Sequence, residues 1–139
     1  MTRINCVPVK ELHNKHLVAE YHELPRVFGI VRTALDRGRD PANVGAPAEY
    51  TLGEGHVKFF YTRLGYLLER QAELVIEMME RKMKPKMPDI RGLAVGIPAS
   101  LLNSWMPTDA AMALNRARLA ERLAVIEAKK PRPVPSHKD

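Results

Sequence analysis

Two short stretches of this chain carry residues whose types and spacing suit chemistry. The first is MTRIN at the start, where the small residue Thr2 follows Met1. A small second residue normally permits removal of the initiator methionine, so we expect Thr2 to carry a free α-amine. An α-amine has a pKa of about 7.7–8.0, and about a tenth of it is neutral and nucleophilic near pH 7. The chain terminus is therefore a candidate reagent.

The second stretch, HLVAEYHELPRVFG, begins at His16 and has helical spacing. At about 100° per residue, His16 and Glu23 lie nearly in line on one flank of the apolar face, with small Ala19 between them and Arg26 further round. This flank combines an imidazole, a carboxylate and a guanidinium around a gap. A plain solvated surface with a Glu23–Arg26 ion pair, contributing a few tenths of a kcal/mol, has the same pattern.

A metal site on the same helix is a further alternative. His13, His16, Glu20 and Glu23 are ligand types that zinc takes in proteins. Only His16 and Glu20 have the spacing of a helical ligand pair, and the HExxH motif is absent. Activity that survives a chelator would exclude this alternative.

Composition narrows the possible partners. The 139 residues carry a formal net charge of +6 with a pI of about 9.7, which favours nucleic acid ahead of membrane as a partner. Cys6 is the only cysteine, which excludes an intrachain disulfide and a four-thiolate zinc site. No apolar run is long enough for a signal peptide or a membrane span. We expect a cytoplasmic, nucleoid-associated protein of a bacterial or phage-infected cell.

Apolar periodicity predicts the elements that must position these residues. Residues 2–13 form an extended lead-in. A first helix runs from Asn14, its N-cap, to about Arg37; it is kinked at Pro25 and ends at Gly38. The lead-in spans up to about 40 Å when extended, so it can fold back along this helix.

Two more helices follow after Gly- and Pro-rich connections. One covers about residues 56–83, and the side chains on its predicted solvent face are Glu69, Arg70, Glu73 and Glu77. The other is capped by Thr108 and Asp109 and ends near Lys129. The sequence thus predicts an all-α fold, a single compact domain (residues 1–130) of three main helices with long irregular loops, followed by a flexible Pro-rich tail (131–139).

Four segments resemble the phage-type pyrimidine-dimer DNA glycosylases, also called dimer-specific endonuclease V: MTRIN, HLVAEYHELPRVFG, LGEGHVKFFYTRLGYLLERQAEL and ARLAERLA. The resemblance covers about residues 1–125 and agrees with the three-helix fold. The positions that match in the first part of the chain are Thr2, Arg3, His16, Glu20, Tyr21, Glu23, Pro25, Arg26, Phe28 and Gly29.

The resemblance implies a DNA repair N-glycosylase with abasic-site lyase activity that incises DNA at cyclobutane pyrimidine dimers without metal or organic cofactor. It implies that the Thr2 α-amine is the nucleophile, forming an imine (Schiff base), and that Glu23 is the essential carboxylate. The expected partner is duplex DNA with photoproducts or abasic sites, bound by a monomer away from membranes. The expected DNA-binding residues are Arg3, Lys15, His16, His22, Arg26, Arg118 and Arg122.

The chain also departs from the family pattern. His22 stands where the family usually has arginine, and Lys15 where it usually has glutamine. The closing segment KKPRPVPSHKD lacks the aromatic residues of the family's C-terminus, and Trp105 is the sole tryptophan. Since base stacking contributes about 1–3 kcal/mol per base, these differences bear on lesion specificity. Two alternatives therefore stay open: the same amine chemistry on a different damaged or modified base, and a catalytically silent DNA-binding module.

Overall fold

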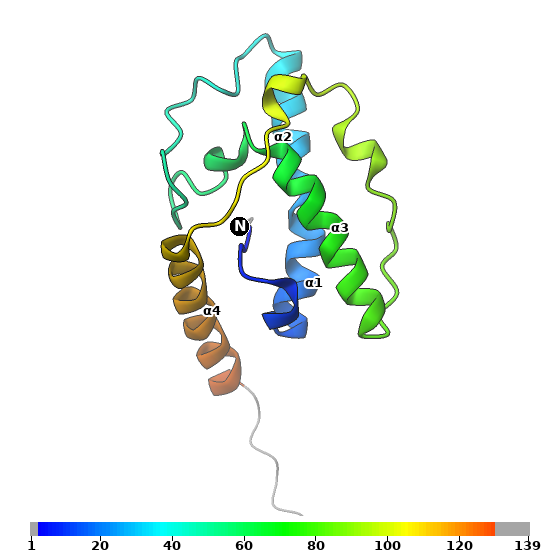
Figure 1. The fold of residues 1–139 in the computed structure, drawn as a ribbon, viewed down its shortest axis with the longest axis vertical. Helices are drawn as coiled ribbons and strands as arrows, with labels where there is room; N and C mark the ends of the chain where they lie inside the picture. The colour runs from blue at the N-terminus through cyan, green and yellow to red at the C-terminus, as the bar shows by residue number, and fades with distance from the viewer. Residues whose placement is uncertain (1–2, 130–139) are drawn as a thin grey trace, which may run out of the picture.

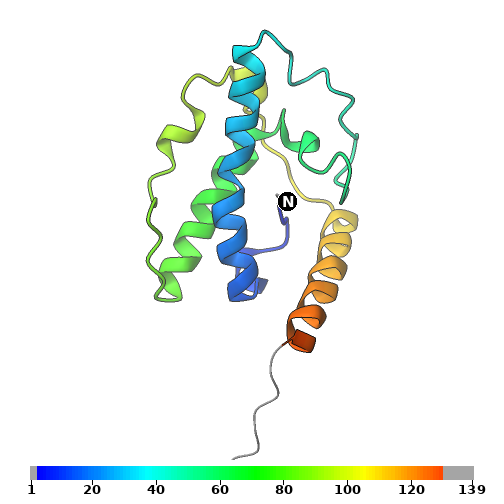
Figure 2. The ribbon, with the colours of Figure 1, turned by 180° about the vertical axis from the view of Figure 1, so that it is seen from behind.

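Helices α1 (Asn14–Glu23) and α2 (Pro25–Asp36) follow one another in a single rod (Figures 1 and 2). The structure, a computed structural model, describes residues 3–129. Leu24 lies between the two helices and keeps helical dihedral angles, with φ −56° and ψ −43°. Because Pro25 has no amide hydrogen, the hydrogen-bond ladder is interrupted while the path of the chain continues. The kinked first helix is thus present as two helices in line.

The ends of this rod follow local hydrogen bonding. The predicted N-cap at Asn14 is wrong by one residue, because the imidazole Nδ1 of His13 accepts the bond from the Lys15 amide at 3.1 Å. The predicted end at Gly38 is confirmed. Gly38 has a φ of +72°, and its amide donates to the Leu35 carbonyl at 3.0 Å, as at many helix C-termini.

Helix α3 (Leu64–Glu80) starts later than the predicted His56. The residues between His56 and the helix form turns around a 3-10 helix, η2 (Lys58–Phe60), and Arg63 leaves the helical region with φ −126° and ψ 37°. Arg63 instead makes an isolated β-bridge with Leu102. A Cβ on Gly65 would lie 2.5 Å from the Leu102 carbonyl oxygen, so the contact with a distant segment fixes where the helix begins.

Two charged residues predicted on the solvent face of α3 are buried. Arg70 is 2% exposed and its Nε donates to Glu20 Oε2 at 2.8 Å. Glu77 accepts hydrogen bonds from Arg81 at 2.8 Å and Lys10 at 3.3 Å. A buried charge needs such partners, and sequence periodicity does not reveal them. The other two residues predicted on this face are exposed.

Helix α4 (Asp109–Lys129) lies apart from α1 and α3, and the N-terminal segment runs between them (Figures 1 and 2). The predicted cap of α4 is confirmed, since the Ala111 amide donates to Thr108 Oγ1 at 3.0 Å. A short 3-10 helix, η1 (Val9–Glu11), turns the N-terminal segment toward α1. The segment is therefore an interior element, packed on several sides.

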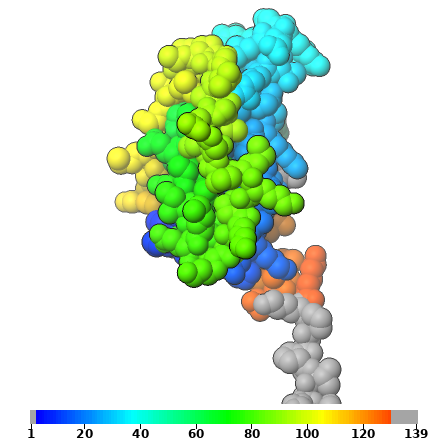
Figure 3. All heavy atoms as spheres, turned by 90° about the vertical axis from the view of Figure 1, so that its right-hand side faces the viewer, coloured from blue at the N-terminus to red at the C-terminus, as the bar shows by residue number. Residues whose placement is uncertain are grey.

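The long connection between α3 and α4 covers the side of α2 and α3 seen in Figure 3. It then brings Trp105 onto the ring of Tyr50, stacked at 5.8 Å between ring centroids. Phe59 and Phe60 meet Trp105 edge-on, so the tryptophan belongs to an aromatic cluster of the core.

These elements confirm the predicted all-α fold, with the α1–α2 rod, α3 and α4 as its three main helices. Within residues 3–129, the bridge at Arg63 is the only strand pairing. None of the helices in this range is both long and apolar enough to cross a membrane.

Candidate active site

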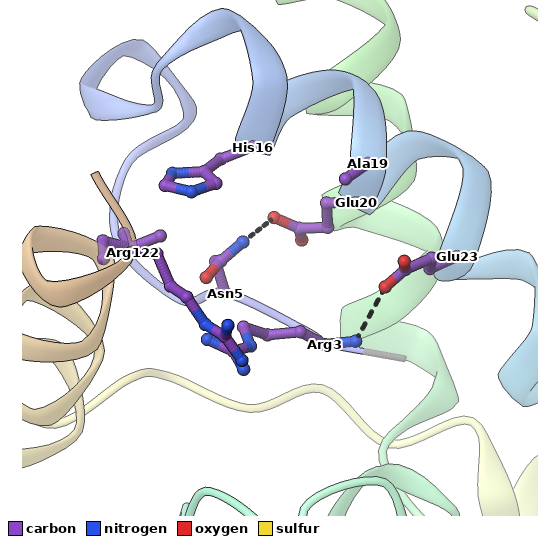
Figure 4. Close-up of a pocket in the computed structure, with 8 residues that line it drawn as sticks. Arg3, Asn5, His16, Ala19, Glu20, Glu23 and Arg122 are labelled. Carbon is purple, nitrogen blue, oxygen red and sulfur yellow. Dashed lines mark hydrogen bonds between the residues drawn. The ribbon is translucent and has the colours of Figure 1, made fainter. Parts of the chain in front are cut away.

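A cavity of about 250 Å³ opens between α1, α4 and the N-terminal segment. It gathers four of the predicted site residues and the small residue that was expected to leave a gap between them. Figure 4 shows the arrangement of the lining side chains, which are Arg3, Asn5, His16, Ala19, Glu20, Glu23, Leu119 and Arg122.

Glu23 lies half-buried at the end of α1, beside the N-terminal segment. Its Oε1 accepts a hydrogen bond from the main-chain nitrogen of Arg3 at 3.1 Å (Figure 4). One turn earlier, Glu20 Oε1 accepts from Asn5 Nδ2 at 2.8 Å. The segment therefore runs antiparallel to α1, as predicted for a lead-in that folds back to Glu23. Thr2, the predicted nucleophile, lies outside the described residues.

The residue after Arg3 is held on both of its main-chain polar groups. The Ile4 amide donates to His56 Nε2 at 2.8 Å, and the Ile4 carbonyl accepts from the Tyr50 hydroxyl at 2.9 Å. His56 Nδ1 lies 2.7 Å from the Thr51 carbonyl, which requires a hydrogen on Nδ1 and leaves Nε2 as the acceptor. Burial lowers the pKa of His56, which favours this neutral form.

Two arginines that line the cavity, Arg3 and Arg122, together with the nearby Arg118, give its mouth a positive charge. Burial lowers the pKa of the Arg3 guanidinium, and the charges of Arg122 and Arg118 lower it further. Figure 4 shows the side chains of Arg3 and Arg122 next to each other. Arg118 lies one turn before Arg122 on α4. Its Nε forms an ion pair with Glu121 Oε1 at 3.5 Å. Such a cluster attracts phosphate groups.

His16 faces the cavity from the first turn of α1 (Figure 4). Burial lowers the pKa of His16, and the nearby His13, Arg3 and Arg122 act in the same direction. Its Nδ1 is buried and has no hydrogen-bond partner among the described residues. A neutral imidazole at this wall can donate or accept one hydrogen bond toward a bound ligand.

The remaining predicted DNA-binding residues lie away from the cavity. Lys15 is exposed in the first turn of α1. His22 lines a separate cavity of about 180 Å³ beside α3, and Arg26 lines a hollow over α2. Among the ion pairs formed within residues 3–129, none joins Arg26 to Glu23. The alternative of a Glu23–Arg26 surface pair is therefore wrong.

The metal alternative on α1 is not supported by the side-chain positions. Glu20 is bound by Arg70 through two nitrogens, at 2.8 and 3.1 Å, and by Asn5. Over the described part of the chain, no three His, Cys, Asp or Glu side chains come together as a ligand group. Burial also raises the pKa of the Cys6 thiol to about 11, so it stays protonated at neutral pH.

Sequence reasoning missed several residues that build this site: Asn5, His56, Arg70 and Asn115. The weak signal for Asn115 is its position three residues before Arg118, on the same face of the last helix. Asn5 lies two residues after a predicted site residue in the lead-in. For the other two no local signal exists, because their partners are about fifty residues away along the chain.

A half-buried carboxylate beside the N-terminal segment, with arginines around it, suits a protein that acts on a polyanion. The family model described as pyrimidine dimer DNA glycosylase matches residues 1–91, and the chain belongs to that family. The family predicted from the sequence is thereby confirmed. Membership makes the protein a DNA repair glycosylase for pyrimidine dimers, with dimer-containing DNA as its partner. The matched region ends before α4, so Arg118 and Arg122 lie outside it.

Proposed function

We propose that the protein breaks a glycosylic bond of the dimer and cuts the strand through one covalent intermediate, an imine formed by the Thr2 α-amine. The observation that carries this proposal is the 3.1 Å hydrogen bond from the Arg3 amide nitrogen to Glu23 Oε1. The α-nitrogen of the preceding residue is three covalent bonds from that amide, a separation of no more than about 4 Å. Its connection to Arg3 therefore keeps the amine within reach of the carboxylate.

The reaction proceeds in steps that conserve atoms and charge. The lone pair of the neutral amine attacks C1′ of the sugar, the C1′–N1 bond breaks, and N1 of the pyrimidine takes the proton that the amine loses. The detached pyrimidine stays joined to its neighbour through the cyclobutane ring. The sugar ring then opens at its C1′–O4′ bond, O4′ takes a proton, and a protonated imine forms. Loss of a proton from C2′ and cleavage of the C3′–O bond complete the β-elimination. Water releases the enzyme with its amine restored.

Glu23 is suited to two tasks in this reaction: stabilising the positive charge that develops at C1′, and moving protons afterwards. One of its oxygens accepts from the Arg3 amide, and its half-buried position leaves capacity on the cavity side. As a carboxylate it stabilises positive charge at C1′ while the base departs. It can afterwards carry the protons exchanged between the amine, O4′ and C2′.

The arginines at the cavity mouth supply affinity. Arg3, Arg118 and Arg122 meet phosphates on either side of the lesion, which strengthens binding without reading sequence. Lys15, His22 and Arg26 extend this contact outward along α1 and α2. All of these groups belong to one chain, so the proposal requires no second copy.

Borohydride trapping tests the covalent step, because hydride reduces an imine to a stable secondary amine. The native protein is incubated with duplexes that contain one cyclobutane dimer, one abasic site, or no damage. We expect a protein–DNA adduct on the first two only, and peptide mass spectrometry should locate the link on the α-nitrogen of Thr2. The intact mass should show that Met1 is removed.

Two variants at residue 2 provide matched controls. Thr2→Ser keeps a small residue, so Met1 is still removed and the adduct should form. Thr2→Gln carries a large side chain that retains Met1 and should abolish the adduct while leaving DNA affinity unchanged. An adduct formed only with another lesion would select the alternative substrate. Binding without any adduct would contradict the proposed chemistry and favour a silent binding module.

A further inference from the structure

A closed ring of hydrogen bonds surrounds residues 5–7 of the N-terminal segment. Asn115 Nδ2 donates to Asn5 Oδ1 at 2.8 Å, and Asn5 Nδ2 donates to Glu20 Oε1 at 2.8 Å. Glu20 is held by Arg70, whose Nη1 donates to the Val7 carbonyl at 2.6 Å. The Val7 amide donates back to Asn115 Oδ1 at 3.2 Å, which closes the ring.

The four side chains of this ring come from four different elements and are withdrawn from solvent. Their exposed fractions are 3% for Asn5, 1% for Glu20, 2% for Arg70 and 0% for Asn115. They belong in that order to the N-terminal segment, α1, α3 and α4. The ring therefore fixes the segment against all three main helices.

Asn115 is the residue of the ring whose side chain accepts hydrogen bonds from the main-chain amides of the segment. Its Oδ1 accepts from two consecutive amides, those of Cys6 at 2.7 Å and Val7 at 3.2 Å. An amide side chain offers this acceptor and, in the same group, the donor that reaches Asn5. If the segment shifted by one residue, both amides and the Asn5 side chain would lose their partners inside the core.

The ring is tied to the helix that carries the proposed active-site carboxylate. Glu20 and Glu23 are three residues apart on α1, about one turn. The first holds Asn5 and the second holds the Arg3 amide, at 2.8 and 3.1 Å. A register that is fixed at residues 5–7 therefore fixes which main-chain atom faces Glu23.

We propose that Asn115 is a positioning residue for the reaction: it sets the register of the N-terminal segment so that the terminal amine faces Glu23. This inference rests on the proposed function, since it assigns Asn115 a task only if that amine is the nucleophile. It gives α4, which lies outside the region matched by the family model, a role in the chemistry as well as in contacting phosphates.

The test compares Asn115→Ala with a core variant that should lower the free energy of unfolding by a similar amount. Val31→Ala also removes a fully buried side chain, but from α2, and Val31 takes part in no hydrogen bond of the ring. Both variants are measured with an abasic duplex at saturating concentration and at a temperature where melting curves show them folded. The readouts are the dissociation constant by fluorescence anisotropy and the rate constant of adduct formation by quenching with borohydride at timed intervals.

Asn115→Ala should lower the rate constant about 10- to 100-fold, because misplacement of a reacting group by about 1 Å has that effect, while the dissociation constant stays within about threefold. Its amine should still react with formaldehyde at the wild-type rate, since that reaction needs no alignment with Glu23. Val31→Ala should keep the wild-type rate of adduct formation. An Asn115→Ala protein that forms the adduct as fast as Val31→Ala would overturn the inference.

A measurement on the wild-type protein covers the case in which Asn115→Ala does not fold. Hydrogen exchange at the Cys6 and Val7 amides should be as slow as in the middle of α3. Fast exchange at these two amides would show that the ring does not hold the segment and would also overturn the inference. If the wild-type protein forms no adduct at all, the proposed function fails instead, and exchange still reports on the ring.

Discussion

Glu20 and Glu23 are the same residue type one turn apart on α1, yet their surroundings are opposite. Glu20 is fully buried and accepts three hydrogen bonds, two from Arg70 and one from Asn5. Glu23 is half-buried at the cavity edge and accepts one, from the Arg3 amide. The first carboxylate has its acceptor positions occupied by the protein, whereas the second can meet a substrate.

The same contrast holds for the arginines. Arg70 is buried with a carboxylate and a carbonyl as partners. Arg122 reaches the cavity mouth from α4, where it adds to a cluster of like charge. Arg70, with its partners satisfied, holds the N-terminal segment, whereas Arg122 forms no ion pair within residues 3–129 and is left for DNA. In this molecule, the number of hydrogen-bond partners that a charged residue has within the protein distinguishes a supporting residue from a candidate catalytic one. Residue type alone does not make that distinction.

Replacing the unsaturated carboxylate should have the largest effect. Glu23→Gln keeps an acceptor for the Arg3 amide, so the fold should be unchanged. The rate of glycosylic-bond cleavage should fall about 10³-fold, equivalent to about 4 kcal/mol, because a neutral amide cannot stabilise positive charge at the sugar. Single-turnover strand cleavage of a dimer duplex measures this, and anisotropy should show DNA affinity within about threefold of wild type. Unchanged turnover would refute the role assigned to Glu23.

The matched change at the saturated carboxylate should act on stability instead. Glu20→Gln leaves the buried Arg70 guanidinium without its counter-charge, which should lower the free energy of unfolding by about 3 kcal/mol. For a chain of this length the melting temperature should fall by about 10 °C. Urea denaturation measures the first and calorimetry the second.

A second variant sharpens this prediction. Glu20→Gln combined with Arg70→Met removes both charges and should be more stable than Glu20→Gln alone, because no unpaired charge stays buried. If Glu20→Gln is as stable as wild type, the hydrogen-bond ring around the N-terminal segment does not stabilise the fold as proposed.

The arginines at the cavity mouth should control the salt dependence of binding. Arg122→Ala should weaken DNA binding about 3- to 10-fold and make the slope of log affinity against log salt shallower by about 0.9, one phosphate contact. Arg118→Ala combined with Arg122→Ala should change the slope by about twice that amount. Arg116→Ala is the matched control, since Arg116 is also on α4 but pairs with Glu11 at 2.8 Å. Equal slopes for Arg116→Ala and Arg122→Ala would remove the proposed phosphate contact.

Local pattern was enough to predict the frame of this site. The apolar face of the first predicted helix contains Leu17, Tyr21 and Phe28, and all three side chains are buried. The same helical geometry put Ala19 and Glu23 on one flank, where they line the cavity. These features depend on neighbours within a turn or two, so the sequence contains them.

What the sequence could not supply is pairing over long separations. The Ile4 amide meets His56 across 52 residues, and the Cys6 amide meets Asn115 across 109. Arg70 was expected in solvent because it is charged and lies outside the apolar stripe of its helix; its buried partner, Glu20, comes from α1. A polar residue on a helix face has no local mark that tells solvent from a distant partner.

His56, which holds the Ile4 amide, should make the free energy of unfolding depend on pH. This is the smallest of the expected effects. Burial lowers the pKa of His56 in the folded protein, and Nε2 must stay unprotonated to accept from the Ile4 amide. The unfolded chain protonates near pH 6.5, so stability is full above that pH and declines as pH falls below it. Between pH 7.5 and 5.5 the loss of unfolding free energy cannot exceed about 1.4 kcal/mol for this group.

His16, whose pKa burial also lowers, adds to this pH dependence. Urea denaturation at the two pH values measures the decline. His56→Gln keeps an acceptor but does not titrate, so it should flatten the decline, and His16→Gln should flatten it further. A decline of wild-type size in His56→Gln would show that the grip on Ile4 does not depend on a neutral imidazole.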